Sequence, residues 1–382
     1  MRFILGGKRK AASPRGRSGG CRLAERPFRA SSPAILKFAL VAALAHPDPT
    51  GEPPIACSAE PGDRVDGPHA RRAYALIGSM STPFPRVALF GRFQTAAVGE
   101  SVRDIADFLA KRGIEVLLDE NTAASIGSGP WQVADTERIG HQASLAIAVG
   151  GDGTMLGVAR VLAPFGIPVV GINHGRLGFI TDIALAGWRP ALGTILDGQF
   201  ESEERSLLTS RVVRAGEMVW QELSLNDVVV SRSSRSGMIE LQVSVDGLYM
   251  YTQRGDGLII ATPTGSTAYS LSANGPILHP LLRGVVLVPV APQTLSNRPI
   301  CLPDGASVAV RVLEGREPRV ACDMQVFTDL QPNDDIVIER APFTTRFLHP
   351  PGYSYFATLR GKLNWGELPS SLSSAAGGGS DD

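Results

Sequence analysis

Hydrophobic residues follow two kinds of spacing in the segment that begins at Arg86. The apolar run "RVALFG" predicts a short strand that ends at Gly91. The next apolar residues recur every three or four positions, which predicts one buried face of a helix that ends near Gly113: Val98, Val102, Ile105 and Leu109. "IEVLLDE", "SLAIAVG" and "IPVVGIN" then indicate strands, and "TMLGVARVLA" a helix. This succession predicts a parallel sheet with right-handed crossovers.

The spacing changes to strict alternation after about Ala186, following one more helical stretch, "WRPALGTILDG". "MIELQVSV" and "LYMYTQ" flank Asp246-Gly247, which predicts a hairpin because Asp-Gly suits a type I′ turn. The runs "VVLVPV", "SVAVRVL", "RVACDMQ" and "DIVIERA" continue the pattern. The predicted fold is therefore an α/β domain with a parallel, Rossmann-like sheet, followed by an all-β domain that is antiparallel and sandwich-like.

The two ends of the chain differ from this patterned part. Residues 1–84 are basic and rich in Gly, Ser and Pro, which predicts a disordered leader. Its apolar run "AILKFALVAALA" is typical of an export signal, but Lys37 interrupts it and it is too short to span a bilayer. Met80 stands just before the ordered pattern, so we interpret the leader as upstream sequence. Residues 369–382 predict a flexible tail.

Composition narrows the classes of partner. Lys and Arg together number 37 among the 382 residues, as do Asp and Glu, so bulk charge favours neither a nucleic acid nor a membrane. Any anionic ligand must then be held by local groups. The 4 cysteines lack CxxC spacing and the 6 histidines stand apart, which indicates neither a zinc site nor a disulfide framework. Reduced thiols indicate a cytoplasmic protein.

The first candidate site is "GGDGT", where Asp152 stands between glycines at the end of a predicted buried strand. Glycine lets a ligand lie directly on the backbone amides, and the following helix start favours phosphate. No GxxxxGK[ST] run exists, and Leu156 occupies the third glycine position of GxGxxG. A tight turn in which Asp152 bonds only local amides is the alternative.

Two further segments place polar residues near apolar strands. In "TPTGSTAYSLS", Tyr269 offers an aromatic face that could stack on a base. The hydroxyls before the expected short helix could also serve only as caps: Thr264, Ser266 and Thr267. Asn226 and Asp227 interrupt the apolar strand of "LSLNDVVVSR", and buried polar groups need partners. A ligand ribose or a local turn would supply them.

Taken together, these motifs resemble the NAD kinase family in its bacterial, ATP-dependent form. "GGDGTML", "GINHGRLGFITD", "LNDVVV", "QRGDGLIIATPTGSTAYSLSANGPILHP", "LSNRPI" and "HPPGYSYFATLRGKLNW" occur in the family's order between Val87 and Trp365. The resemblance implies transfer of the ATP γ-phosphoryl group to the 2′-hydroxyl of the adenosine ribose of NAD, giving NADP. It also implies a divalent metal such as Mg²⁺, without assigning any residue as its ligand, and a homo-oligomer, either a dimer or a tetramer.

Domains and site residues follow from the same resemblance. It implies a nucleotide-binding domain at 85–185, an NAD-binding domain at 186–342, and a segment at 343–368 that packs back on the first domain. Asp152 matches the catalytic acid, which orients or deprotonates the 2′-hydroxyl. The other residues expected to bind the dinucleotide are Gly153, Phe179, Asn226, Asp227, Arg254, Asp256, Thr267, Ala268, Tyr269, Ser270, Leu271, Ser272 and Gln325.

Three positions depart from the family pattern. Gly237 replaces a His or Arg, Asn274 replaces a common glycine, and Gln293 replaces the usual His. Two other functions stay open: a GGDGT-type kinase for a lipid or sugar, and a catalytically silent NAD-binding regulator. The Tyr269 block argues against the first, and a carboxylate placed near phosphates argues against the second.

Overall fold

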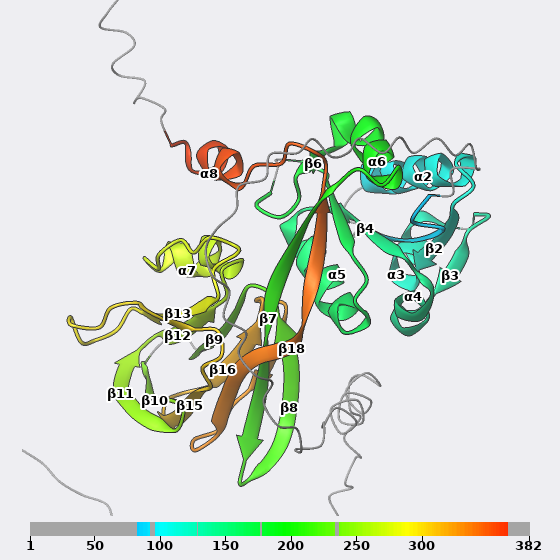
Figure 1. The fold of residues 1–382 in the computed structure, drawn as a ribbon. Helices are drawn as coiled ribbons and strands as arrows, with labels where there is room; N and C mark the ends of the chain where they lie inside the picture. The colour runs from blue at the N-terminus through cyan, green and yellow to red at the C-terminus, as the bar shows by residue number, and fades with distance from the viewer. Residues whose placement is uncertain (1–81, 92–95, 128, 176–177, 234–236, 366–382) are drawn as a thin grey trace, which may run out of the picture. The chain divides into compact units, whose positions relative to one another are not determined.

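The computed structural model describes residues 82–91, 96–127, 129–175, 178–233 and 237–365 (Figure 1). The predicted leader up to residue 81 and the predicted tail lie outside these residues. Among the helices of the described part, none combines the length and apolar character that a bilayer crossing requires.

A parallel sheet flanked by helices forms the amino-terminal half. Its strands, in sheet order, are β5 (Val169–Asn173), β4 (Leu145–Gly150), β1 (Arg86–Gly91), β2 (Glu115–Asp119) and β3 (Gln132–Ala134). Its helices are α2 (Ala96–Lys111), α3 (Glu120–Ile126), α4 (Thr136–Gln142), α5 (Asp152–Leu162) and α6 (Trp188–Leu196). The four apolar residues predicted to share one face of α2 are all buried. Alternating strand and helix patterns therefore produced the predicted parallel sheet.

The carboxyl-terminal half contains a separate antiparallel sheet of six strands. In sheet order these are β14 (Ile300–Pro303), β13 (Gly284–Val290), β12 (Gly257–Ala261), β9 (Asp227–Arg232), β16 (Pro318–Cys322) and β17 (Val326–Asp329). The predicted hairpin is also present, as β10 (Ile239–Val245) and β11 (Leu248–Gly255). Asp246 and Gly247 both take positive φ, 51° and 77°, as a type I′ turn requires.

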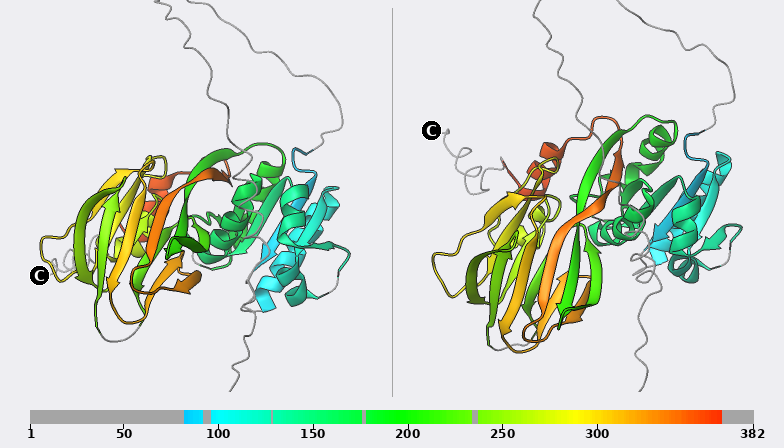
Figure 2. Two further views of the ribbon diagram at one scale, coloured as in Figure 1. Left: turned by 90° about the horizontal axis from the view of Figure 1, so that it is seen from below. Right: turned by 60° about the horizontal axis from the view of Figure 1, so that its bottom comes forward.

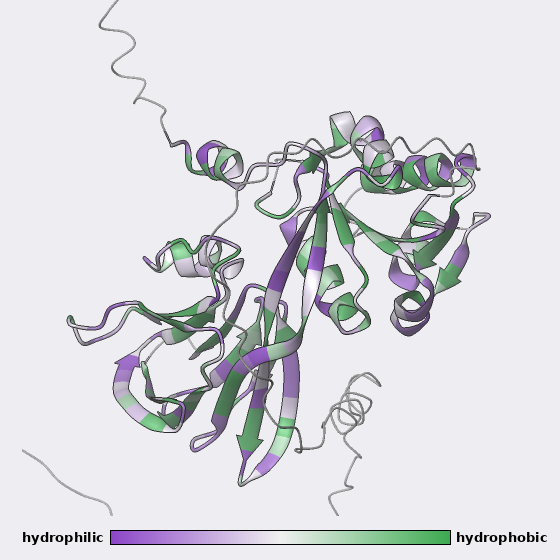
Figure 3. Ribbon diagram, viewed as in Figure 1, coloured by the Kyte–Doolittle hydropathy of each residue, from purple (hydrophilic) through white to green (hydrophobic). Residues whose placement is uncertain are grey.

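Apolar side chains from the two sheets meet in a sandwich core. Val228, Leu258 and Leu287 of the six-stranded sheet share a cluster of buried side chains with Leu241 of β10 and Val310 of β15 (Val308–Glu314). The strands on both sides of this core carry hydrophobic residues, as the green segments of Figure 3 show. The predicted class, an α/β part followed by an antiparallel β part, is confirmed.

Two long strands connect the halves. β7 (Glu201–Arg214) pairs with β18 (Asp335–His349) along most of its length, and the two run side by side in both views of Figure 2. β18 also meets β5 in parallel, at Phe347 and Val169. The larger sheet thus has 12 strands and extends from one half into the other. β8 (Glu217–Ser224) pairs with β7, and β6 (Ile183–Ala184) pairs with β5.

Several elements differ from the sequence prediction, and two of them have a clear physical reason. β7 was not identified as a strand, because charged residues obscure its alternation. The strand expected over "RVACDMQ" ends at Cys322, because Asp323 and Met324 both take φ of 52°, in the left-handed region. The remaining helices are short: 3₁₀ turns at Ala163–Phe165, Leu185–Gly187 and Gly265–Thr267, α7 (Tyr269–Ser272) and α8 (Tyr355–Leu363).

Candidate active site

Asp152 is the first residue of α5 and follows β4 directly. Its Oδ2 accepts a hydrogen bond from the Phe179 amide at 2.7 Å. Its Oδ1 accepts from the Ile180 amide at 3.3 Å and from Thr181 Oγ1 at 2.8 Å. An ionised carboxylate offers about four acceptor positions, so three donors orient it and leave room for one more. A tight turn in which Asp152 bonds only local amides does not describe this site, because the donors to its carboxylate come from a loop 27 to 29 residues away.

The loop that holds Asp152 depends on a glycine. A Cβ built on Gly178 would lie 1.7 Å from Asp152 Oδ1 and 2.3 Å from Thr181 Oγ1, so no larger residue fits there without movement. Asn173, the last residue of β5, donates from Nδ2 to Thr181 Oγ1 at 2.7 Å. Sequence reasoning missed Gly178, Thr181 and Asn173 as parts of the site. The position of "INHGRLGFITD" at the end of β5, the strand beside β4, could have identified them as site residues.

The turn at 323–325 links Asp152 to the β-rich half. Gln325 Nε2 donates to the Gly153 carbonyl at 2.7 Å, so these two predicted site residues do lie together. Asp323 forms a buried ion pair with Arg160 of α5 at 3.0 Å. Its carboxylate also accepts from the amides of Leu225, Asn226 and Asp227, at 2.7 to 3.3 Å. Asp323 was not predicted from the sequence, because nothing local distinguishes it from a turn residue.

Asp227 is a buried carboxyl group at the start of β9. Burial, together with the charge of Asp323, raises the pKa of Asp227 to about 7. Its Oδ1 has no hydrogen-bond partner among the described residues. Buried polar atoms are normally paired, so an unpartnered carboxyl oxygen here is what a ligand hydroxyl could satisfy.

The segment after β12 folds against Asn226. The Thr262 amide donates to the Asn226 carbonyl at 2.9 Å, and a Cβ on Gly265 would collide with the same oxygen. The hydroxyls weighed as caps have partners within the chain: Ser266 Oγ donates to the Pro263 carbonyl at 2.7 Å, and Thr267 Oγ1 to the Thr264 carbonyl at 3.2 Å. Neither hydroxyl accepts from an amide at a helix start, and within the described residues neither N-cap side chain of the 3₁₀ turn or α7 makes a capping bond, so the capping interpretation is wrong.

The residues from Thr267 to Ser272 form the end of the 3₁₀ turn and α7. Tyr269 and Ser272 are exposed, whereas Thr267, Ala268 and Leu271 are half-buried. Ser270 is fully buried, and its Oγ has no hydrogen-bond partner among the described residues. The exposed ring of Tyr269 is consistent with stacking on a base.

Phe179 lies beside Asp152 and carries one of its amide donors. Its ring is half-buried, with Lys362 Nζ of α8 5.8 Å from the ring centroid. A cation at this distance can be attracted by the ring face. The segment after β18 therefore contacts the loop that holds Asp152.

Arg254 and Asp256 are not brought to this site within one chain. Arg254 is paired with Glu240 at 3.5 Å, and Asp256 accepts from Arg232 Nε at 2.7 Å. Both lie at the end of β12 opposite to Asp227, since Gly257 pairs with Ser231 and Ala261 with Asp227. Five residues of extended chain separate the two ends, a span of roughly 16 Å.

One family departure is explained by backbone geometry. Asn274 takes φ of 65°, a region that glycine adopts freely and that asparagine tolerates better than other residues. The Gln293 amide donates to the Arg254 carbonyl at 2.8 Å, on the side of the β sheet away from Asp227. Gly237 takes φ of 92°, and a Cβ there would meet nothing within 4 Å.

The described residues contain no group of three or more His, Cys, Asp or Glu side chains placed to hold a metal ion. Asp152 is a single carboxylate with one acceptor position left. Mg²⁺ is often held by one or two carboxylates plus substrate phosphates, and the site fits only that mode.

This chain is similar to known proteins over most of its length. Two family models match it: "ATP-NAD kinase N-terminal domain" over residues 87–200 and "ATP-NAD kinase C-terminal domain" over residues 225–350. The NAD kinase of Burkholderia mallei (strain SAVP1) is 55% identical over 288 residues, which cover 75% of this chain and 96% of that protein. The NAD kinase of Paraburkholderia phymatum is 54% identical over 290 residues, covering 76% and 97%.

Solved structures resemble the fold as well. A yeast NADH kinase complexed with NADH has a TM-score of 0.70 at 20% identity, covering 75% of this chain and 89% of that one. An Archaeoglobus fulgidus NAD kinase in complex with ATP has a TM-score of 0.58 at 26% identity, covering 73% and 98%.

Proposed function

The chain belongs to the NAD kinase family, and we propose that Asp152 is the group that orients and deprotonates the 2′-hydroxyl of the adenosine ribose. The enzyme is an ATP-dependent phosphotransferase whose acceptor is NAD and whose product is NADP. The ribose oxygen forms a bond to the γ-phosphorus of ATP while the bond to the leaving ADP oxygen breaks. The hydroxyl proton passes to the carboxylate of Asp152.

The observation that carries this role is the way Asp152 is held. Three donors from residues 179–181 orient the carboxylate at a helix start, and one acceptor position remains for a substrate hydroxyl. The amides at the start of α5 favour the negative charge of phosphates nearby. Phosphoryl transfer depends mainly on positioning and charge stabilisation, so one oriented acid is sufficient protein chemistry.

The dinucleotide is proposed to lie between Asp152 and the segment after β12. Asn226 and Asp227 would accept from ribose hydroxyls, because the buried Asp227 Oδ1 otherwise lacks a partner among the described residues. The exposed ring of Tyr269 would stack on adenine, within a block that runs from Thr267 to Ser272. Gly153, Phe179 and Gln325 would line the same space. Arg254 and Asp256 have ion-pair partners on neighbouring strands, so no substrate contact is assigned to them within one subunit.

A divalent metal such as Mg²⁺ is proposed to enter with the ATP phosphates, because the described residues offer no group of three or more ligands and the free position of Asp152 is assigned to the ribose hydroxyl. When bound, it would neutralise charge on the transferred phosphoryl group. We also propose a cytoplasmic homo-oligomer, a dimer or a tetramer. Leu248 and Tyr249, at one hairpin, are 74% and 64% exposed, which supports an association surface. Light scattering after gel filtration would test it.

The replacement Asp152→Asn tests the catalytic assignment, because it keeps the side-chain volume and removes the charge. A general base contributes about 10²- to 10⁴-fold to rate, so kcat should fall by about that factor. NAD affinity should change by less than about 10-fold, equivalent to about 1.4 kcal/mol. NADP formation with ATP and Mg²⁺, NAD titration and a melting curve measure these quantities.

A folded Asp152→Asn enzyme with near-normal turnover would refute the assignment. Diacylglycerol offered in place of NAD serves as the control for a lipid kinase. Phosphorylation of diacylglycerol without NADP formation would refute the assignment of NAD as the phosphoryl acceptor.

A further inference from the structure

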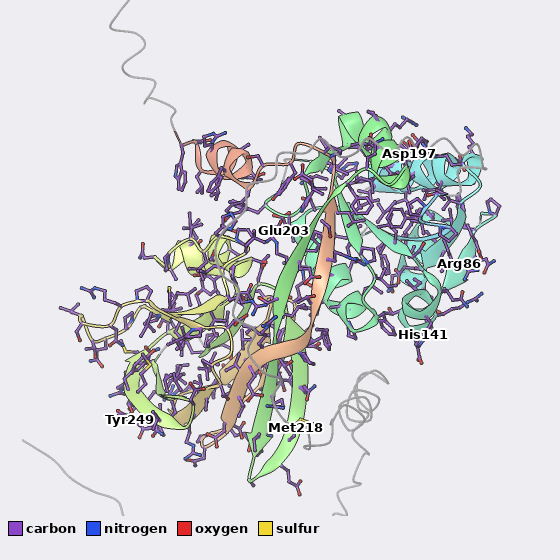
Figure 4. All side chains as sticks on the ribbon, viewed as in Figure 1. Arg86, His141, Asp197, Glu203, Met218 and Tyr249 are labelled. Atoms are coloured by element: carbon purple, nitrogen blue, oxygen red, sulfur yellow. The ribbon has the colours of Figure 1, made fainter. Side chains whose placement is uncertain are left out.

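Four charged side chains, of which Arg205 and His349 are buried and the two acids half-buried, meet between the long strands and the loop that follows Gly178: Asp182, Glu203, Arg205 and His349. We call them the junction cluster. His349 Nδ1 lies 3.0 Å from Asp182 Oδ2, and Nε2 lies 3.3 Å from Glu203 Oε2. Arg205 Nη2 donates to the same Glu203 oxygen at 2.7 Å. The side chains of His349 and Arg205 are only 2% and 3% exposed, and Glu203 is labelled on β7 in Figure 4.

The cluster contains balanced charge when His349 is protonated. Burial lowers the pKa of His349, but the hydrogen bonds and charges of Asp182 and Glu203 outweigh burial and hold that pKa above its usual value. Burial raises the pKa of Glu203, but the hydrogen bonds and charges of His349 and Arg205 outweigh burial, so the net shift of that pKa is downward. Two anions then face two cations in a site from which water is largely excluded. Unpaired charges there would be strongly unfavourable.

Aromatic rings also pack around the junction cluster, and Glu201 is the cross-strand partner of His349. Tyr353 stacks on the imidazole with ring centroids 3.8 Å apart and an interplanar angle of 7°. Burial raises the pKa of Tyr353 to about 12, so it stays neutral. The nearby Tyr355 also has a raised pKa, chiefly through burial. Phe347 lies under the Arg205 guanidinium, 5.6 Å from ring centroid to Cζ. Within the junction cluster, His349 is the residue type whose ordinary pKa lies near neutral pH.

The junction cluster touches both sides of the reaction site. Asp182 follows Thr181, whose hydroxyl donates to Asp152 at 2.8 Å. On the other side, Arg205 Nη1 donates to Thr264 Oγ1 at 3.1 Å. Thr264 opens the segment that carries Tyr269 and packs against Asn226. One connected set of ion pairs thus joins the loop that orients the acid to the segment that is proposed to hold the acceptor.

We propose that protonated His349, held between Asp182 and Glu203, is a positioning residue. It keeps the carboxylate of Asp152 at a fixed position relative to the segment that begins at Thr264. The inference rests on the proposed role of Asp152. A neutral ring keeps only one N–H, so loss of the proton would leave one of the two carboxylates, Asp182 or Glu203, without a donor from His349 and would weaken the connection between the loop of Thr181 and β7. Turnover should then fall at alkaline pH while the contacts that bind NAD persist.

The variants His349→Gln and Asp182→Asn test this, with Asp334→Asn as the matched control. Asp334 is buried and pairs with Arg214 at 2.7 Å, at the opposite end of the β7–β18 ladder. We expect both cluster variants to lose about 10-fold in kcat with KM for NAD changed less than about threefold. The control should show a comparable fall in melting temperature with kcat within about twofold of the parent.

The pH profile supplies the second readout. The alkaline fall in kcat of the parent enzyme should be absent from His349→Gln, in which no group titrates at that position. A kcat for His349→Gln within twofold of the parent, or an unchanged alkaline fall, would overturn the positioning role. If His349→Gln does not fold, Asp182→Asn answers the kcat question with the imidazole intact. Retained turnover in Asp152→Asn would instead refute the assignment of the acid, so the two failures are distinguishable.

Discussion

Replacing Gly178 with alanine should disable the enzyme without changing any side chain that is proposed to touch substrate. The added methyl group would lie 1.7 Å from Asp152 Oδ1 and 2.3 Å from Thr181 Oγ1. Ordinary carbon–oxygen contacts begin at about 3.3 Å. The carboxylate and the loop must therefore separate by at least about 1.5 Å, which breaks the short bond from the Phe179 amide.

The expected loss follows from that displacement. A misplacement of about 1 Å in a catalytic group can cost about 10²-fold in rate, so Gly178→Ala should lower kcat by at least this factor, or about 2.7 kcal/mol in activation free energy. KM for NAD should change little, since Asn226, Asp227 and Tyr269 lie on other segments.

Steady-state NADP formation and a melting curve are the measurements. Gly187→Ala is the matched control, because a Cβ at Gly187 meets nothing within 4 Å. It should keep parental kcat and stability. If Gly178→Ala stays folded and keeps kcat within about threefold of the parent, the position of the Asp152 carboxylate does not control the rate, and the reasoning fails.

Further predictions concern the rest of the site. Tyr269→Ala should raise KM for NAD more than it lowers kcat, because base stacking contributes about 1 to 3 kcal/mol, and an unchanged KM would mark the ring as structural. Asp323→Asn should lower the free energy of unfolding in urea by about 3 to 5 kcal/mol, because Arg160 would keep a buried charge without its partner. The pKa of Asp227, about 7 in the folded protein, lies above that of an unfolded aspartate. Its protonated form therefore stabilises the fold below about pH 4, and this contribution is lost as pH rises through about 7. Asp227→Asn should flatten that part of the stability curve in urea titrations between about pH 4 and 8.

The sequence by itself determined the local elements and the first half of the site. Continuous apolar runs predicted β1 and β4, and helical spacing predicted α2, because such patterns report which positions of an element are buried. Asp246-Gly247 predicted the hairpin, since that dipeptide readily adopts two consecutive positive φ angles. The glycines around Asp152 likewise predicted a carboxylate at the end of a strand. These features depend only on residues close together in the chain.

Only the tertiary structure decided which distant residues complete the site. Gly178 and Thr181 belong to the site because their loop contacts Asp152. Asp323 belongs to it because its carboxylate accepts from the amide of Leu225, 98 residues earlier in the chain. The charged residues Glu203 and Arg205 obscured the strand pattern of β7 in the sequence. The same two residues belong to the junction cluster with His349, which lies 144 residues after Arg205. Charged residues in a strand ordinarily indicate a solvent-facing side. Here they are buried or half-buried because Arg205 and Glu203 pair with each other and Glu203 also faces His349 from a distant segment, a contact that no local pattern predicts.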